Sequence, residues 1–186
     1  KSAGWIKIDD GNWSESASEL HNVDIEAVVD DYKNVKPHDN ESIAPLVQAS
    51  FDIETYSDEG FPDATRPTNE CIQISTTLQR FGEPEPYKKH LLTLKKCNPI
   101  EGVEVVSFDT EKEVLEAWTQ LIKDEGVDML IGYNIWGFDL NYMYKRAEYC
   151  EAAGFFNLGK VIEEDSELKA TTFSSSAYGD NDYFMV

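Results

Sequence analysis

Apolar and polar positions alternate most clearly in residues 47–54, where Phe51 and Ile53 are interleaved with Asp52 and Glu54. A period of two predicts a strand with one apolar face and one polar face. Both carboxylates then point to the same side of the strand. Their repulsion is tolerated when a cation lies between them or when both reach water.

Three further apolar runs predict strands over residues 71–78, 87–94 and 103–108. The segments 57–69 and 82–86 contain Gly and Pro and separate the first three strands of the chain. Such segments favour loops and turns, so we expect an antiparallel meander. The first of them is long enough to form an exposed loop.

The period then changes to about 3.6 residues, which is typical of a helix. Thr110 followed by Glu113 forms a capping box, which predicts a helix start. Gly126 is expected to end this helix. Its apolar stripe consists of Val114, Leu115, Trp118, Leu121 and Ile122.

Residues 127–133 are largely apolar and predict a fully buried strand, as is usual for a parallel strand between helices. A second helix is predicted over residues 138–153, with Gly154 as its end. Residues 171–182 are rich in Ser, Gly and Asp and predict a mobile loop before a last strand. The resulting order of strands and helices indicates an α/β domain with a mixed sheet flanked by helices, as in the ribonuclease H-like arrangement.

Charge narrows the possible functions. The chain of 186 residues has a formal net charge of −20, whereas phosphate binding depends on Lys and Arg. We therefore expect contact with nucleic acid to need metal ions, or basic surface from other parts of the protein. No apolar run approaches the length of a membrane span, so no membrane partner is expected. The three cysteines contain no CxxC pair and predict free thiols.

A third carboxylate, Asp139, follows the apolar run at the start of the second predicted helix. Hydrolysis of a phosphodiester is well served by two divalent ions, and hard ions such as Mg²⁺ prefer oxygen ligands. Asp52, Glu54 and Asp139 therefore predict a divalent-metal site, with Asp52 bridging the ions and Glu54 orienting the attacking water. Asn134 is a candidate to fix the loop or approach the substrate, and Phe138 to stack on a terminal base.

Each of these residues also has a plainer interpretation. Asp52 and Glu54 are alternatively a solvated pair, and Asp139 a cap for its helix. Asn134 is alternatively a turn residue, and Phe138 a core residue or a staple to the helix. The spacing of these residues alone leaves both interpretations open.

Two motifs carry a resemblance to a known family. Residues 50–54, Ser-Phe-Asp-Ile-Glu, resemble the first exonuclease motif of the family B DNA polymerases. Residues 131–140, Ile-Gly-Tyr-Asn-Ile-Trp-Gly-Phe-Asp-Leu, resemble the second. The resemblance runs from about residue 43 to 160 and includes stretches similar to the delta-type replicative enzymes, at residues 72–74, 81–86, 92–94 and 115–118.

The resemblance implies the 3′-to-5′ proofreading exonuclease domain of a DNA-directed DNA polymerase that acts in DNA replication. Residues 1–42 would be the C-terminal part of the polymerase N-terminal domain or a linker, and residues 43–186 an exonuclease domain that is incomplete at its C-terminus. By motif match, Asp52, Glu54 and Asp139 would be catalytic acids that bind two Mg²⁺ or Mn²⁺ ions. Asn134 and Phe138 would contact the single-stranded 3′ end of the primer.

The resemblance also implies features beyond this chain, which we interpret as a piece of a longer protein. The third exonuclease motif of the family has a Tyr and another Asp. We assign neither Tyr178 nor Tyr183 to it, and expect the isolated chain to have little or no nuclease activity. Expected partners are DNA, the rest of the polymerase chain, and accessory subunits or a sliding clamp. The expected location is the nucleus, or a replication site in the host cell for a viral protein.

The sequence is also compatible with two alternatives to a polymerase part. One is a free-standing exonuclease of the ribonuclease H-like fold, and the other is a non-catalytic scaffold domain of that fold. The retained carboxylates favour an enzyme over the scaffold. The delta-type stretches between the two motifs favour the polymerase over the free-standing exonuclease.

Overall fold

The structure is a computed structural model and describes residues 4–17, 20–162, 164–176 and 179–185. The chain divides into two compact units, Lys1–Ala44 with Lys160–Ile162, and Pro45–Gly159 with Glu163–Val186. Compactness alone does not tell which domain a unit belongs to, so the assignment of residues 1–42 to a neighbouring domain remains a prediction.

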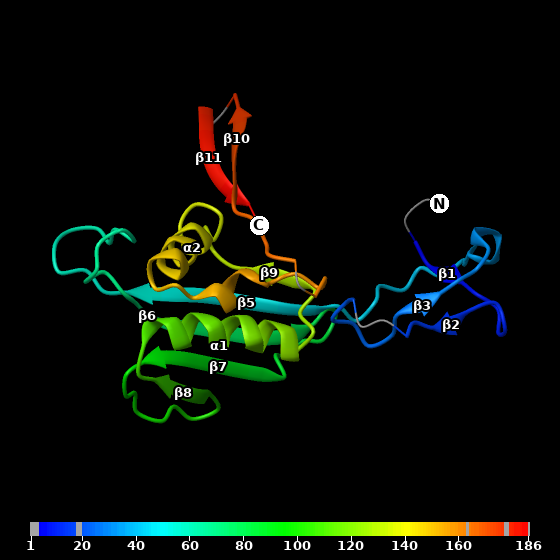
Figure 1. The fold of residues 1–186 in the computed structure, drawn as a ribbon, viewed down its shortest axis with the longest axis horizontal. Coiled ribbons are helices and arrows are strands. Elements are labelled where there is room, and N and C mark those ends of the chain that lie inside the picture. The colour runs from blue at the N-terminus through cyan, green and yellow to red at the C-terminus, as the bar shows by residue number, and fades with distance from the viewer. Residues whose placement is uncertain (1–3, 18–19, 163, 177–178, 186) are drawn as a thin grey trace. The chain divides into compact units, whose positions relative to one another are not determined.

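The second unit is built on a five-stranded mixed sheet with the order β8-β7-β6-β5-β9 (Figure 1). Strands β5, β6 and β7 form the predicted antiparallel meander, which is confirmed. At the two edges, β8 pairs with β7 and β9 pairs with β5, both in parallel. The strands are β5 (Val47–Thr55), β6 (Cys71–Arg80), β7 (Lys88–Leu94), β8 (Glu104–Phe108) and β9 (Met129–Ile131).

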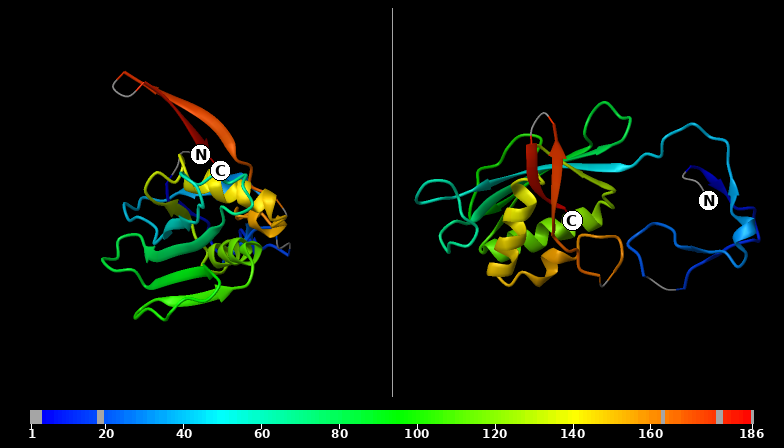
Figure 2. Two further views of the ribbon diagram at one scale, coloured as in Figure 1. Left: turned by 90° about the vertical axis from the view of Figure 1, so that its left-hand side faces the viewer. Right: turned by 90° about the horizontal axis from the view of Figure 1, so that it is seen from above.

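Two helices complete this unit, α1 (Glu111–Asp124) and α2 (Asp139–Tyr149), and α1 runs along one face of the sheet (Figure 2). The predicted capping box is present at the start of α1: the Thr110 side chain accepts from the Glu113 N–H, and the Glu113 carboxylate accepts from the Thr110 N–H. After α2 the chain forms a short 3-10 helix, η2 (Ala153–Phe156). The sheet and the two helices bear out the α/β fold class.

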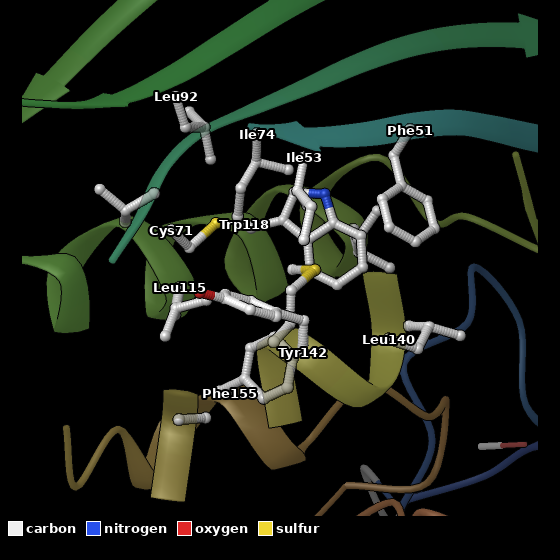
Figure 3. Packing of buried hydrophobic residues seen from close by; sticks show 14 of the residues in the cluster. Phe51, Ile53, Cys71, Ile74, Leu92, Leu115, Trp118, Leu140, Tyr142 and Phe155 are labelled. Atoms are coloured by element: carbon white, nitrogen blue, oxygen red, sulfur yellow. The ribbon is translucent and has the colours of Figure 1, made fainter. Parts of the chain in front are cut away.

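The core lies between the sheet and the helices. Phe51 and Ile53 point from β5 toward Trp118 of α1, and Leu140 of α2 lies in the same cluster (Figure 3). The Trp118 ring packs on Phe51 with ring centroids 4.9 Å apart, and its indole N–H donates to the hydroxyl of Thr76. The apolar face of β5 is therefore fixed toward the helices, which leaves its polar face on the other side of the sheet.

Three expectations about element boundaries are wrong. Strand β9 covers only three residues, and Tyr133, predicted to lie in a buried strand, is 91% exposed. Helix α2 ends at Tyr149, because Glu151 adopts a left-handed conformation (φ 54°), while Gly154 lies inside η2. The predicted mobile loop is instead an antiparallel hairpin of β10 (Lys169–Ser175) and β11 (Gly179–Met185).

The first unit contains two small antiparallel pairs and a 3-10 turn. Strand β1 (Ile6–Lys7) pairs with β4 (Lys36–Pro37), and β2 (Ser14–Glu15) pairs with β3 (Ala27–Val28). The turn is η1 (Tyr32–Asn34). All buried core residues in the described part of the chain belong to the second unit. No helix in the described ranges has the length and apolar character needed to cross a membrane.

Candidate functional site

The site is organised by the different lengths of two neighbouring strands. Strand β5 continues to Thr55, whereas parallel pairing with β9 stops at Ser50. Within the described residues, the second half of β5 therefore has β6 on one edge and no strand on the other. Along this half, Asp52 and Glu54 are exposed on the face opposite the buried Phe51. The prediction that the two carboxylates share one face is confirmed.

Asp139, the first residue of α2, takes the position that β9 leaves open. The Ile53 N–H donates to Asp139 Oδ1 at 3.3 Å, so a carboxylate replaces the missing strand as hydrogen-bond partner. Asp139 is only 4% exposed. The third predicted acid is thus bonded to the residue that lies between Asp52 and Glu54 on β5.

This location has an electrostatic cost for Asp139. Burial raises the pKa of its carboxyl above the ordinary value, and the charge of Asp52 raises that pKa further. The backbone N–H groups of Asp139 and Ile53 donate hydrogen bonds that act in the opposite direction. A buried carboxylate next to another negative charge is a favourable place for a cation.

A turn between β9 and α2 brings Asp139 to β5. At Gly132 an added Cβ would lie 2.7 Å from the Phe51 carbonyl oxygen and 2.4 Å from a methyl carbon of Ile135, so only glycine fits there. Asn134 is left-handed with φ 55°, and its carbonyl accepts from the N–H groups of Gly137 and Phe138. The backbone of Asn134 therefore shapes this turn, while contact of its exposed side chain with a substrate remains a prediction.

Phe138 lies between two other aromatic rings. Its ring centroid is 5.4 Å from that of Phe61 and 5.2 Å from that of Tyr142. The ring is half-buried and packs against the core cluster. Phe138 is therefore a packing residue, which was the alternative interpretation of its position in the sequence. Its expected role in stacking on a base remains a prediction.

Comparison with known proteins identifies the family. A family model described as "DNA polymerase family B, exonuclease domain" matches residues 1–185. The chain belongs to this family. The exonuclease domain is similar to a DNA polymerase of Paramecium bursaria Chlorella virus NY2A, with 38% identity over 90% of the chain. It is also similar to DNA polymerase delta catalytic subunits of Oryza sativa subsp. japonica, with 36% identity over 94% of the chain, and of Bos taurus, with 41% over 77%.

These relatives are much longer than the chain, which aligns with 19%, 16% and 13% of their respective lengths. The resemblance of the chain to the family B polymerases is thereby confirmed, and so is the expected relation to delta-type and viral enzymes. The match also fits the mixed sheet with two helices, as expected for the ribonuclease H-like domain of this family.

The family B exonuclease domain offers carboxylate oxygens as possible metal ligands. Among the residues that the structure describes, no three or more His, Cys, Asp or Glu side chains gather closely enough to hold an ion. Asp139 is turned toward the Ile53 N–H, whereas Asp52 and Glu54 extend into solvent. Because the latter two are exposed, their side chains can rotate without displacing packed groups, and their hard oxygen donors suit Mg²⁺.

The sequence analysis did not predict a buried ion pair that connects α1, α2 and the loop between β5 and β6. Arg146 of α2 forms a bidentate pair with Glu111 of α1 and also donates to the carbonyls of Ala64 and Arg66. The acidic partner in turn accepts from the Cys71 N–H at 2.7 Å. The two charged residues are 35 positions apart, so no local spacing in the sequence connects them.

One spacing in the family B domain differs from expectation. Asp182 follows Tyr178 by four positions, as in a Tyr-x-x-x-Asp pair, although we expected neither tyrosine to fit such a motif. Tyr178 and the side chain of Asp182 lie outside the described residues. The expectation that the third exonuclease motif and its Asp lie beyond this chain therefore stays a prediction.

Proposed function

We propose that this domain is a 3′-to-5′ exonuclease that hydrolyses the terminal phosphodiester of a DNA primer strand, as the proofreading part of a DNA-directed DNA polymerase. The main support is the hydrogen bond from the Ile53 N–H to Asp139, which links the third acid to the strand that carries Asp52 and Glu54. Membership of the family B exonuclease domains and the names of the relatives provide the second support.

The three acids are proposed to work with two divalent ions, Mg²⁺ or Mn²⁺. Asp52 would lie between the ions, Glu54 would hold the ion on the water side, and Asp139 would ligate the other directly or through water. Such a pair of ions activates water and stabilises charge on the leaving oxygen. Asn134 and Phe138 are proposed to hold the single-stranded 3′ end, by an amide contact and by stacking on the last base.

The proposal extends to the protein that contains this domain. The DNA primer end, the rest of the polymerase chain and accessory subunits or a sliding clamp are the proposed partners. The proposed place of action is the nucleus, or the replication site of a DNA virus in its host cell, since the relatives include plant, cattle and viral polymerases. The net charge of −20 supports a need for cations or for basic surface elsewhere in the protein.

A double substitution in the full-length protein tests the proposal. Asp52→Ala with Glu54→Ala should abolish removal of a mismatched primer end and leave primer extension unchanged, and chelation of Mg²⁺ should abolish both. A matched control is Glu83→Ala with Glu85→Ala, because these exposed acids also stand two residues apart, in the turn between β6 and β7. Mismatch removal that survives the first double substitution would contradict the proposal.

The isolated chain is proposed to have little or no nuclease activity, because only three carboxylates are assigned to the site. Purified chain with Mn²⁺ and a single-stranded DNA primer provides the test. Robust digestion would contradict this part of the proposal, and Asp182 would then be the first residue to replace by Asn.

A further inference from the structure

One face of α2 carries three buried polar groups. Asp139, Tyr142 and Arg146 are 4%, 4% and 1% exposed, and their spacing places them on the same side of the helix. Buried polar groups need hydrogen-bond partners. All three have partners in β5 or in the loop of residues 56–70 that joins β5 to β6. This face of α2 is therefore held by hydrogen bonds as well as by packing.

The start of α2 has no side-chain cap. Its N-cap residue is Phe138, and no side-chain hydrogen bond is made there. Ser, Thr, Asp or Asn at this position would stabilise the first turn. The carboxylate of the next residue, Asp139, accepts from the Ile53 N–H of β5. The turn that carries this acid therefore depends on bonds from other positions of the helix.

The hydroxyl of Tyr142 supplies such a bond. It donates to the carbonyl of Asn69 at 2.9 Å, and the ring belongs to the core cluster between the helices and the sheet (Figure 3). Tyr142 follows Asp139 by three residues, which is less than one turn of a helix. The bond therefore holds the same turn that carries the acid.

The acceptor of this bond is itself fixed. Asn69 is fully buried, and its side chain accepts from the Asp63 N–H at 2.9 Å and donates to the Asp58 carboxylate at 3.0 Å. Arg146, one turn further along α2, donates to two carbonyls of the same loop. A fixed acceptor suits a positioning role, because a bond to a mobile loop would let the helix end move with it.

We propose that Tyr142 is a positioning residue of the exonuclease, whose hydroxyl fixes the first turn of α2 and so keeps the Asp139 carboxylate on strand β5. The inference rests on the proposed function and assigns Tyr142 no contact with ions or DNA. A group misplaced by about 1 Å can lower a reaction rate by about 100-fold, so a small shift of the helix end would impair the reaction.

Tyr144 provides a matched control within the same helix. It is also buried, and its hydroxyl also donates to a backbone carbonyl, that of Ser166 at 3.1 Å. Burial raises the pKa of both tyrosines to about 12, so both hydroxyls stay protonated and can donate at neutral pH. Tyr144 lies on another face of α2, and its partner lies outside β5, β6 and the loop between them. Tyr142→Phe and Tyr144→Phe therefore remove the same kind of bond from two faces of one helix.

The first test measures digestion of a single-stranded DNA primer by the full-length protein with Mg²⁺. Tyr142→Phe should lower kcat roughly 10- to 100-fold, because Asp139 is no longer held in place. KM for the primer should stay unchanged, since the substituted residue does not touch DNA. Tyr144→Phe should change neither constant. Primer extension should be unaffected in both variants, which shows that the rest of the protein is folded.

A second test follows Asp139 without ions or DNA. Its carboxylate protects the Ile53 N–H, so hydrogen exchange of this amide in the metal-free full-length protein reports whether the acid stays in place. Tyr142→Phe should speed this exchange by about tenfold or more, whereas exchange in β7 should not change. Tyr144→Phe should leave both unchanged. Mass spectrometry with fragmentation of the peptide that contains Ile53 measures the rate.

The two readouts together separate positioning from general stability. Equal loss of kcat in both variants, or faster exchange throughout the sheet after Tyr142→Phe, would make Tyr142 an ordinary stabilising residue and overturn the proposal. Unchanged kcat, or loss of kcat while Ile53 stays protected, would also overturn it, because the effect would not act through Asp139. A rise in KM alone would indicate a contact with the primer and would contradict the proposal as well.

Failure of this inference is distinguishable from failure of the proposed function. If Asp52→Ala with Glu54→Ala leaves primer digestion intact, the proposed function fails, while exchange at Ile53 still tests the link between Tyr142 and Asp139. If that double substitution abolishes digestion, and Tyr142→Phe matches the unaltered protein in both readouts, only the inference about Tyr142 fails.

Discussion

Removing one partner of the buried pair of Glu111 and Arg146 should cost far more stability than breaking a surface ion pair among the described residues. Arg146 is 1% exposed and Glu111 is 5% exposed, so each charge depends on the other and on its remaining hydrogen bonds. Removing one partner of such a pair typically costs about 3–5 kcal/mol, because the other charge stays buried without compensation. We expect Glu111→Gln to lower the free energy of unfolding by an amount in this range.

Urea unfolding of the chain, followed by tryptophan fluorescence, measures this effect, since Trp118 is fully buried in the core. Lys112→Ala is the matched control: this exposed neighbour on α1 pairs with the half-buried Glu116 at 4.0 Å, at the surface of the domain. Such pairs contribute about 1 kcal/mol or less. A cost below about 1 kcal/mol for Glu111→Gln would refute the reasoning, because it would mean that water or another group satisfies Arg146.

A double-mutant cycle isolates the pairwise part of this effect. Glu111→Gln with Arg146→Met removes both charges, so the double variant should be more stable than the sum of the single costs predicts, by roughly 0.5–3 kcal/mol. Arg146→Met also releases the carbonyls of Ala64 and Arg66, so cleavage by a protease within residues 57–69 should become faster. Strict additivity of the two substitutions would show that the ions do not act as a pair.

Three shorter predictions concern a cap, a glycine and the thiols. Thr110→Ala removes the side-chain acceptor of the capping box and should lower the free energy of unfolding by about 1 kcal/mol, as measured by urea unfolding. Gly132→Ala should reduce primer digestion by the full-length protein roughly tenfold or more, because the turn must move away from β5 and carry Asp139 with it. Gly154→Ala is its control, since an added Cβ there meets only ordinary contacts at 3.5 Å, and equal effects of the two substitutions would contradict the steric argument. The pKa of Cys150 is raised to about 12, mainly by burial and in addition by the neighbouring Glu111 carboxylate. Its thiolate is therefore scarce at about pH 8. Iodoacetamide should therefore label Cys97 well before Cys150, and mass spectrometry of the peptides after brief labelling checks the order.

The sequence predicted the fold well where one local signal decided the structure. The capping box at Thr110 and the alternation around Asp52 need only neighbouring residues, and the structure contains both. Boundaries failed where tertiary contacts decided them. Strand β9 stops early because the chain turns at Gly132 to lie on β5, and neither this approach nor the left-handed Glu151 is visible in the apolar pattern.

The hairpin of β10 and β11 was missed for a related reason. Ser, Gly and Asp favour turns and loops, yet backbone pairing of the two strands outweighs that preference from the pair Lys169 and Met185 to the pair Ser175 and Gly179. In the candidate site, too, local signals were predicted from the sequence and tertiary contacts were not. Motifs indicated the three acids, but the anchors of the 56–70 loop depend on Arg146, which lies 80 positions or more from the carbonyls that it binds.

The unequal lengths of β5 and β9 explain why a carboxylate is buried at this site at all. If β9 continued alongside β5, its backbone would bond the Ile53 N–H, and Asp139 would have no place at the strand edge. Because β9 stops, a side chain must supply the acceptor, and an acid does so although its burial favours the protonated form. Asp139→Asn keeps an acceptor for the Ile53 N–H and removes the charge that repels Asp52. The metal-free domain should therefore gain stability at neutral pH from a substitution that removes a proposed metal ligand, which is the exchange of stability for function expected at an active site.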